Sequence, residues 1–146
     1  MIRRPAIIAA ARSWVGTPYQ HQGREKGRAI DCIGLIWGVA REVGYEQTVP
    51  SAYSPTPAAK FVEAQIEGKL ERQNRDRDSL AEGDIVVLWG LNRNGAQHFA
   101  FVGADPGRFT LIHALSHYKK VLEHGLDRQW HRRIMAVYNF PGTEPL

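Results

Sequence analysis

The chain contains only one cysteine in 146 residues, so no disulfide bond within the chain can hold its fold together. It also lacks a long apolar run. Near the N-terminus the apolar residues 6–11 lie between two arginines and Arg12, and this run is shorter than the about 7–15 residues of an export-signal core. No other stretch approaches the roughly 20 apolar residues of a membrane-spanning helix. We therefore expect a protein that is made in the cytoplasm without an export signal and does not insert into a membrane.

Basic residues are in excess, but no long run of them occurs. The formal net charge is +4, with 14 arginines and 5 lysines. These residues are scattered, and acids interrupt the densest group at residues 75–78, whereas an arm that binds nucleic acid needs a longer uninterrupted run. We expect no nucleic-acid partner, while the excess of positive charge is compatible with an anionic polymer such as a bacterial cell wall.

The sequence pattern changes halfway along the chain. Apolar residues at helical spacing follow Pro5 and end at Gly16, and Asp31 is a suitable N-cap for a second helix that ends before Gly44. A third, shorter helix is predicted over residues 57–66. Later apolar runs have strand length and predict strands at 85–89, 97–103, 109–115, 118–122 and 134–139.

Helices followed by strands indicate an α+β fold, in which N-terminal helices pack on a C-terminal antiparallel β-sheet. The length suits one domain, and no repeat or linker divides the chain, so residues 1–146 are expected to form a single domain. The polar stretch 20–28 is expected to be a loop.

The single cysteine, Cys32, stands at the predicted start of the second helix. Unpaired N–H groups and the helix dipole at that position favour the thiolate, which is the nucleophilic form of the side chain. The neighbouring Asp31 would disfavour the thiolate, but as an N-cap it directs its charge at backbone N–H groups, so we expect it to have a structural role. A lone cysteine is otherwise most often a buried apolar residue, and the sequence alone leaves that alternative open.

Two histidines fall on neighbouring predicted strands. If segments 97–103 and 109–115 form a hairpin with an even number of loop residues, paired residue numbers add to an odd constant, and His98 and His113 then share a face. A loop with an odd number of residues would place them on opposite faces. Side chains that share a face lie roughly 5–8 Å apart, so His113 could orient His98 as a base for Cys32.

The side of the first of these strands that carries His98 also carries the small Ala100, whereas Phe99 and Phe101 point the other way. Small side chains leave room for a helix. If the second helix packs on the His98 face, its N-terminus can bring the sulfur of Cys32 to that histidine.

A metal site is the main alternative for the cysteine and histidines. The side chains that zinc accepts would be Cys32, His98, His113 and His117. The sequence has no Cys-x-x-Cys or His-Glu-x-x-His pair, and His113 and His117 would share a face only on a helix, so we expect no metal and no cofactor. The other histidines show no partner pattern, although His21 could line a cleft; they are His117, His124 and His131.

Five segments of the chain, in order, resemble the NlpC-type cell-wall peptidases, a family of papain-like cysteine enzymes. They are Gly16-Thr17-Pro18-Tyr19, Asp31-Cys32-Ile33-Gly34-Leu35, Glu82-Gly83-Asp84-Ile85-Val86, His98-Phe99-Ala100-Phe101-Val102-Gly103 and Ile112-His113-Ala114. Each segment alone is a weak signal, but five in the family's order over most of the chain are specific.

The resemblance implies a papain-like cysteine endopeptidase. In it Cys32 attacks an amide carbonyl, His98 acts as base and then as acid, and His113 orients His98. Tyr19 and Asp31 are implied to lie on the oxyanion and substrate side, where the backbone N–H of Cys32 can also donate. The family's usual substrate is the γ-D-glutamyl bond to diaminopimelate in peptidoglycan stem peptides.

Two positions depart from the family pattern: Ile33 stands where serine is usual, and Phe99 stands where a smaller residue follows the base. The Ile-type motif, the small size and the lack of an export signal resemble the subgroup found in phage tails and phage-derived gene transfer particles. That resemblance implies other tail-tip proteins as partners and local opening of the cell wall during delivery. Two alternatives stay open: a structural tail component without turnover, and an amidase or acyltransferase on the same scaffold.

Overall fold

The computed structural model describes residues 1–45, 66–89 and 98–146. In chain order, helix α1 (Arg4–Arg12) precedes the short strands β1 (Arg24–Glu25) and β2 (Ala29–Ile30), and helix α2 (Cys32–Glu42) follows them. The later elements are β3 (Glu71–Arg72), β4 (Ile85–Leu88), β5 (His98–Asp105), β6 (Arg108–Leu115), β7 (Lys120–Gly125), α4 (Arg128–Arg133) and β8 (Ile134–Asn139). None of the described helices is long and apolar enough to cross a membrane.

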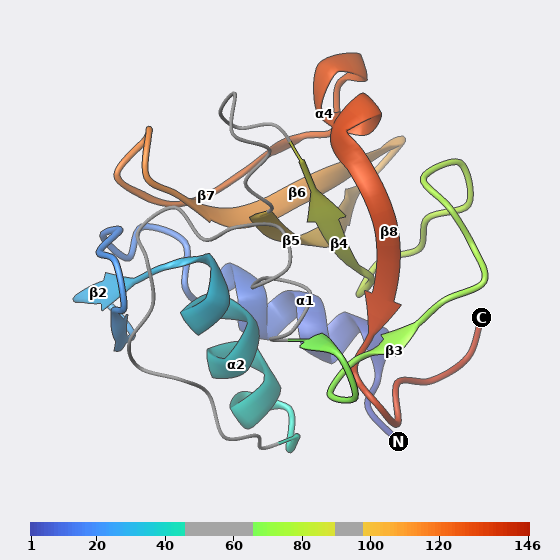
Figure 1. The fold of residues 1–146 in the computed structure, drawn as a ribbon, viewed down its shortest axis with the longest axis horizontal. Coiled ribbons are helices and arrows are strands. Elements are labelled where there is room, and N and C mark those ends of the chain that lie inside the picture. Colours follow the sequence, from blue (N-terminus) through green and yellow to red (C-terminus); the bar gives the residue numbers. More distant parts are fainter. Residues whose placement is uncertain (46–65, 90–97) are drawn as a thin grey trace.

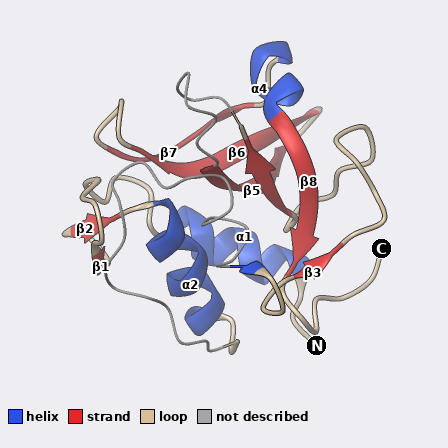
Figure 2. Cartoon of the chain, viewed as in Figure 1, coloured by secondary structure: helices blue, strands red, loops and turns tan. Residues whose placement is uncertain are grey.

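Six strands form one sheet in the order β3-β8-β4-β5-β6-β7 (Figure 2), and β1 pairs with β2 separately. Every neighbouring pair in the larger sheet is antiparallel. The predicted α+β arrangement, with N-terminal helices followed by an antiparallel sheet, is confirmed.

The predicted element boundaries agree best where the apolar runs are long. The strand at 134–139 lies where it was predicted, whereas β7 begins at Lys120 rather than at residue 118 and continues to Gly125. The predicted loop at 20–28 contains a tight antiparallel turn, in which Arg24 pairs with Ile30. The predicted helix at 57–66, except for its last residue, lies outside the described residues, as does the first residue of the strand predicted at 97–103.

Helices α1 and α2 pack on the same face of the sheet, below it in Figure 1, where α2 contacts β5 and β6. The sheet side of this interface consists of large apolar side chains, and Phe99, Phe101 and Ile112 are at most 1% exposed there. The condition that α2 packs on the His98 face is therefore not met. Burying two phenylalanines against the helices removes more apolar surface from water than burying the small residues of the other face would.

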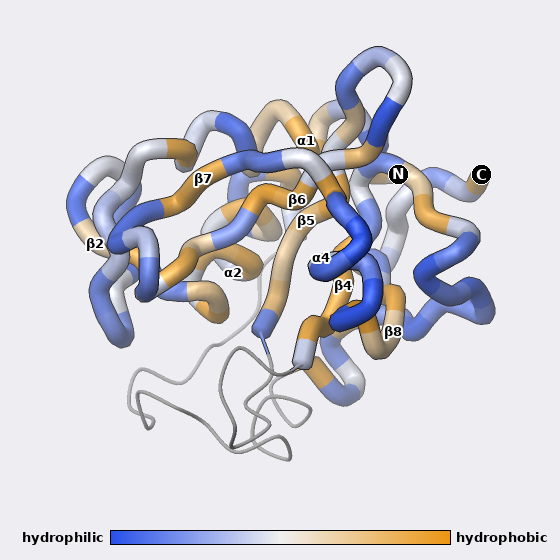
Figure 3. Tube along the Cα trace, turned by 90° about the horizontal axis from the view of Figure 1, so that it is seen from above, coloured by the Kyte–Doolittle hydropathy of each residue, from blue (hydrophilic) through white to orange (hydrophobic). Residues whose placement is uncertain are grey.

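The opposite face of the sheet has an apolar cluster of its own, with α4 beside it. The buried residues of this cluster are Val86, Leu88, Ala100, Val102, Leu111, Ile134 and Val137. In Figure 3 the central strands are largely orange, while α4 is blue. The sequence pattern did not predict α4, because Trp130 is its only apolar residue; Asp127 caps the helix by accepting a hydrogen bond from the backbone N–H of Trp130 at 3.0 Å.

A buried ion network ties the start of α1 to the sheet. The carboxylate of Asp84 is 0% exposed and accepts hydrogen bonds from Arg4 at 3.0 Å and from Asn139 at 2.9 Å. Arg75 donates two more, at 2.7 and 2.8 Å, and the backbone N–H of Ala81 donates one at 2.8 Å. Burial alone would raise the pKa of Asp84, but these bonds favour the carboxylate and hold that pKa below its usual range.

Candidate active site

Cys32 is the first residue of α2, and Asp31 caps that helix. The carboxylate of Asp31 accepts hydrogen bonds from the backbone N–H groups of Gly34 and Gln22, both at 2.8 Å. It also accepts one from Nη1 of Arg24 at 2.9 Å. The predicted N-cap role of Asp31 is confirmed. Because these donors hold both of its oxygens, Asp31 fixes the start of the helix and with it the position of Cys32.

The glycine of this motif, Gly34, is required by close packing. A Cβ atom there would lie 2.6 Å from the carbonyl oxygen of Gly23 and 2.8 Å from Nη1 of Arg24. A side chain at this position would push away the turn that holds Asp31. Glycine therefore allows the turn to pack directly against the start of the helix beside Cys32.

The thiol of Cys32 lies near the start of β5, because the backbone N–H of Phe99 acts on its pKa. The backbone N–H groups of Phe99, Ile33 and Cys32 itself each lower the pKa of Cys32 and so favour the thiolate. Burial outweighs them and, together with the negative charge of Asp31, raises the pKa of Cys32 to about 12. The helix start favours the thiolate as expected, through the N–H groups of Ile33 and Cys32, but burial and Asp31 outweigh this effect and the net shift of the pKa is upward.

His98 opens β5 and His113 lies on β6, and their rings meet on the sheet face opposite α1 and α2. Paired residue numbers in this hairpin add to an odd constant, as for Phe101 and Ile112. Nε2 of His98 lies 2.8 Å from Nδ1 of His113, and the ring centroids are 5.0 Å apart. The predicted same-face placement is confirmed.

Burial keeps both rings neutral at neutral pH, since His98 is 5% exposed and His113 is 0% exposed. Burial lowers the pKa of His98 to about 3. Burial also lowers the pKa of His113 well below its usual value, and the neighbouring His98 and His124 lower it further. Nε2 of His98 is turned toward His113, so Nδ1 is the nitrogen left to receive a proton.

In this resting arrangement the thiol and the ring of His98 are not hydrogen-bonded partners. Within the described residues, no hydrogen bond joins the ring of His98 to Sγ of Cys32. The backbone N–H of Phe99, the residue directly after His98, is close enough to the thiol to lower its pKa. Catalytic hydrogen bonds are often long in a site without substrate and tighten when substrate binds.

A third histidine, His124, for which no partner was predicted, extends the pair. Nε2 of His113 lies 2.7 Å from Nε2 of His124, whose Nδ1 lies 2.8 Å from the carbonyl oxygen of Gly125. Trp130 packs against both rings, with centroids 5.0 Å from each. The register argument, extended to β6 and β7, would have found this contact. We call His98, His113 and His124 the histidine row.

Tyr19 lies close enough to Cys32 and Asp31 for their charges to act on it. Burial is the largest cause of a raised pKa at Tyr19, and the pKa is raised further by Cys32, when it is ionised, and by the negative charge of Asp31. The hydroxyl therefore stays protonated and can donate a hydrogen bond near the sulfur.

The two departures from the family pattern, Ile33 and Phe99, are core residues. Each is 1% exposed and belongs to the apolar cluster between the helices and the sheet. Their side chains therefore serve packing.

The remaining histidines lie away from the row. His117 is exposed between β6 and β7, His131 on α4 bonds to the carbonyl of Arg77 at 3.0 Å, and His21 lies in the turn before β1. Within residues 1–45, 66–89 and 98–146, no group of three or more His, Cys, Asp or Glu side chains is arranged to hold a metal ion.

Comparison with known proteins gives sequence relatives and structural neighbours. No family model matches the chain. A probable endopeptidase of Corynebacterium glutamicum is 33% identical over 122 residues, which are 84% of this chain and 48% of that protein. The chain thus spans about half the length of the curated relatives it matches.

Solved structures match almost the whole chain. A Staphylococcus aureus protein of the NLP/P60 family, described as similar to lipoprotein, has a TM-score of 0.64 at 17% identity, covering 94% of this chain and 41% of that one. The NlpC/p60 domain of the peptidoglycan hydrolase SagA has a TM-score of 0.57 at 23% identity, covering 94% of this chain and 98% of that domain. The chain has the NlpC/P60 fold. The fold expected from the five resembling segments is therefore confirmed.

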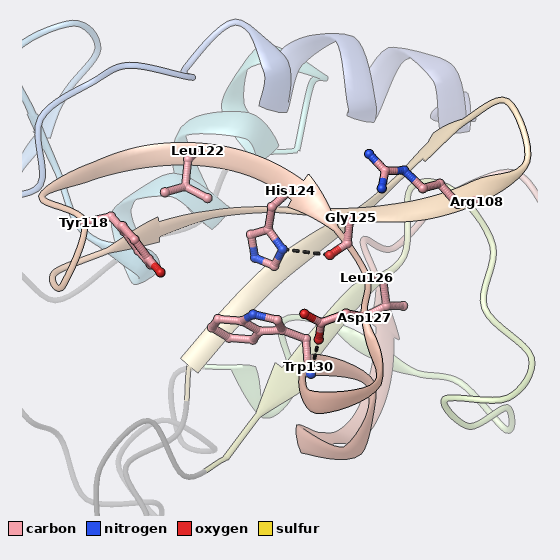
Figure 4. A pocket seen from close by; sticks show the side chains of 8 residues that line it. All are labelled: Arg108, Tyr118, Leu122, His124, Gly125, Leu126, Asp127 and Trp130. Carbon is pink, nitrogen blue, oxygen red and sulfur yellow. Dashed lines mark hydrogen bonds between the residues drawn. The ribbon is translucent and has the colours of Figure 1, made fainter.

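This NlpC/P60 fold contains a pocket of about 560 Å³ at the His124 end of the histidine row (Figure 4). Tyr118, Arg108 and Trp130 line it together with His124. Neither Cys32 nor His98 is among its lining residues, so this pocket is separate from the thiol.

Alkylation of Cys32 by iodoacetamide is expected to be slow at pH 7 and to rise up to at least about pH 10, because only the thiolate reacts and the pKa of Cys32 is raised to about 12. Mass spectrometry of the intact protein over a pH series measures the rate. Cys32→Ser is the unreactive control, since the chain has no other cysteine. A rate that reaches its plateau below about pH 8.5 would show a stabilised thiolate instead.

Lowering the pH from 7 to 5 is expected to reduce the free energy of unfolding by about 2 kcal/mol through His98 alone. An unfolded histidine takes up a proton near pH 6.5, whereas buried His98, with its pKa lowered to about 3, stays neutral. Protons therefore favour the unfolded state below about pH 6.5. Urea unfolding at the two pH values measures the loss.

Two variants test the assignment of this loss to His98. His98→Gln should lose about 2 kcal/mol less than the wild type between pH 7 and pH 5. His117→Gln changes an exposed histidine and should behave like the wild type. Equal losses in all three proteins would contradict a buried, neutral His98.

Proposed function

We propose that the chain is a cysteine peptidase that cleaves amide bonds in peptidoglycan stem peptides, with Cys32 as nucleophile. The observation that supports this most directly is the pairing of His98 with His113, whose facing nitrogens lie 2.8 Å apart. The backbone N–H of Phe99, the residue directly after His98, is close enough to the thiol of Cys32 to lower its pKa. Acyl transfer by cysteine uses a thiol, an imidazole and a group that orients the imidazole. The relative described as a probable endopeptidase supports the same reaction class.

Proton transfer accompanies attack in this proposal, because both partners are neutral at rest. The thiol proton moves to Nδ1 of His98 while Sγ bonds to the carbonyl carbon and the carbonyl electron pair moves to oxygen. When that pair returns, the C–N bond breaks and the leaving amine takes the proton from His98, which leaves a thioester. Water then gives a proton to His98 and its hydroxide to the carbonyl carbon. The C–S bond then breaks, the carboxylic acid leaves, and His98 returns the proton to Sγ.

Two donors near Cys32 are suited to the negative charge on the carbonyl oxygen. They are the backbone N–H of Cys32 at the helix start and the hydroxyl of Tyr19, whose raised pKa keeps it protonated. Asp31 contributes by holding the helix start, since backbone N–H groups and Arg24 occupy its carboxylate.

The bond we propose is the γ-D-glutamyl bond to diaminopimelate, the usual substrate of the cell-wall peptidases that the five segments resemble. Two observations support a peptidoglycan substrate. SagA, whose domain shares the fold, is a peptidoglycan hydrolase, and the net charge of +4 suits an anionic wall polymer.

Digestion of purified peptidoglycan, followed by mass spectrometry of the released fragments, tests the proposal. The endopeptidase reaction frees the carboxyl group of the γ-linked glutamate and an amine of diaminopimelate. The amidase alternative instead frees the lactyl carboxyl group of muramic acid and the amine of the first alanine. Absence of any new terminus would contradict both reactions.

A phage-like tail is the setting we propose for the enzyme, with other tail-tip proteins as partners. The support is the resemblance of the Ile-type motif to the phage and gene-transfer subgroup. The buried position of Ile33 is compatible with turnover, because its side chain packs in the core. Antibody labelling of purified particles checks the setting: label at the tail tip is expected, and particles without the protein would contradict it.

A further inference from the structure

We propose that His124 is a positioning residue, which acts through His113 to fix the nitrogen of His98 that receives the thiol proton. The inference rests on the proposed function, in which His98 is the base. It starts from the end of the histidine row, where the ring of His124 lies above Trp130 and bonds to the carbonyl of Gly125 (Figure 4).

The carbonyl of Gly125 sets the direction of the first hydrogen bond. A carbonyl oxygen can only accept, so Nδ1 of His124, 2.8 Å away, is the donor. In a neutral imidazole one nitrogen donates and the other accepts. Nε2 of His124 therefore accepts, and Nε2 of His113 donates to it across 2.7 Å.

The same rule passes this direction on to His98. Since Nε2 of His113 donates, its Nδ1 accepts, and the donor 2.8 Å away is Nε2 of His98. Nδ1 of His98 then keeps its lone pair, as a base for Cys32 requires. If the row ran in the opposite direction, Nε2 of His98 would accept from His113. Nδ1 of His98 would then hold the proton and have no lone pair to receive the one from the thiol.

Burial fixes the direction of the hydrogen bonds along the histidine row. His113 is 0% exposed, so water cannot replace His124 as the acceptor for its Nε2. Trp130 covers both rings, and Asp127 holds Trp130 in place by capping α4. A buried N–H without an acceptor costs free energy, so the bond to His124 selects one tautomer of His113.

Two substitutions of His124 separate its hydrogen bonds from its packing. His124→Phe keeps a ring beside Trp130 but provides no acceptor, whereas the side-chain oxygen of His124→Gln can still accept from His113. At pH 8 we expect kcat for peptide release to fall on the order of 10- to 100-fold in His124→Phe, with KM unchanged. His124→Gln should restore most of the rate. His117→Phe, at an exposed site, is the matched control.

Long-range ¹H–¹⁵N NMR of the histidine rings shows the tautomers without turnover. In the resting Cys32→Ala protein at pH 8, we expect the proton on Nε2 in His98 and His113 and on Nδ1 in His124. Adding His124→Phe should mix the tautomers of His113 and His98, and adding His124→Gln should keep them single. Unchanged tautomers and unchanged kcat in His124→Phe would overturn the inference.

The two readouts distinguish this inference from the proposed function. If the tautomers respond to His124→Phe but the wild type releases no peptide, the proposed function fails while His124 still positions the row. If the wild type is active and His124→Phe changes neither readout, the inference fails alone. Should His124→Phe not fold, a proton on Nδ1 of His98 in the resting Cys32→Ala protein would overturn the inference, and a proton on Nε2 would support it.

Discussion

Replacing Cys32 with alanine is expected to lower the rate of peptide release from peptidoglycan by at least about 10³-fold. In the proposed reaction Sγ forms the covalent bond to the substrate, and the chain has no second thiol to take its place. Release of new amino termini over time, measured by mass spectrometry at equal concentrations of the two proteins, gives the ratio of rates.

The Cys32→Ala variant should fold, because Asp31 caps the helix through its carboxylate and not through the sulfur. Equal melting temperatures of variant and wild type check this. His117→Ala, at an exposed site, should keep the full rate. If the wild type and Cys32→Ala released the same products at the same rate, Cys32 would not be the nucleophile, and a structural tail component would become the better description.

The parts of the site that could be predicted from the sequence are those set by local geometry. The N-cap position of Asp31 follows from its place before an apolar helical stripe. The meeting of His98 and His113 follows from strand alternation and an even loop, since both fix the face of a side chain without knowledge of the rest of the fold.

The side of the sheet on which α2 packs could not be predicted in the same way. Small residues beside His98 suggested room for a helix, but the helices bury Phe99 and Phe101 on the other side. The predicted thiolate preference of Cys32 was outweighed for a related reason. Helix-end N–H groups are a local feature, whereas the burial that raises its pKa depends on how β5 and α2 pack together.

The surroundings of His124 were not predicted, because they depend on two elements at once. The register of β6 and β7 brings its ring to His113. The short helix α4 then places Trp130 over both rings. A six-residue helix with one apolar side chain leaves almost no periodic signal in the sequence. The N-cap residue Asp127 was the feature that could have indicated this helix.

Neutralising Asp84 by Asp84→Asn is expected to lower the free energy of unfolding by about 3–5 kcal/mol, a large part of the total stability of a small domain. The carboxylate is 0% exposed and neutralises the buried Arg4, 3.0 Å away, and Arg75, 2.7 Å away. Asparagine has nearly the same shape, so the variant removes the charge and leaves the packing. Urea unfolding at pH 7 measures the change.

The dependence of this loss on pH separates charge from packing. The pKa of Asp84 is held below its usual range, so its stabilising effect is complete at neutral pH and is lost as the pH falls below about 4. The stabilities of wild type and Asp84→Asn should therefore converge in acid, and a constant gap down to pH 3 would point to packing instead. Asp105→Asn is the matched control: its carboxylate is 48% exposed, with arginine nitrogens at 3.9 Å, and should cost less than about 1 kcal/mol.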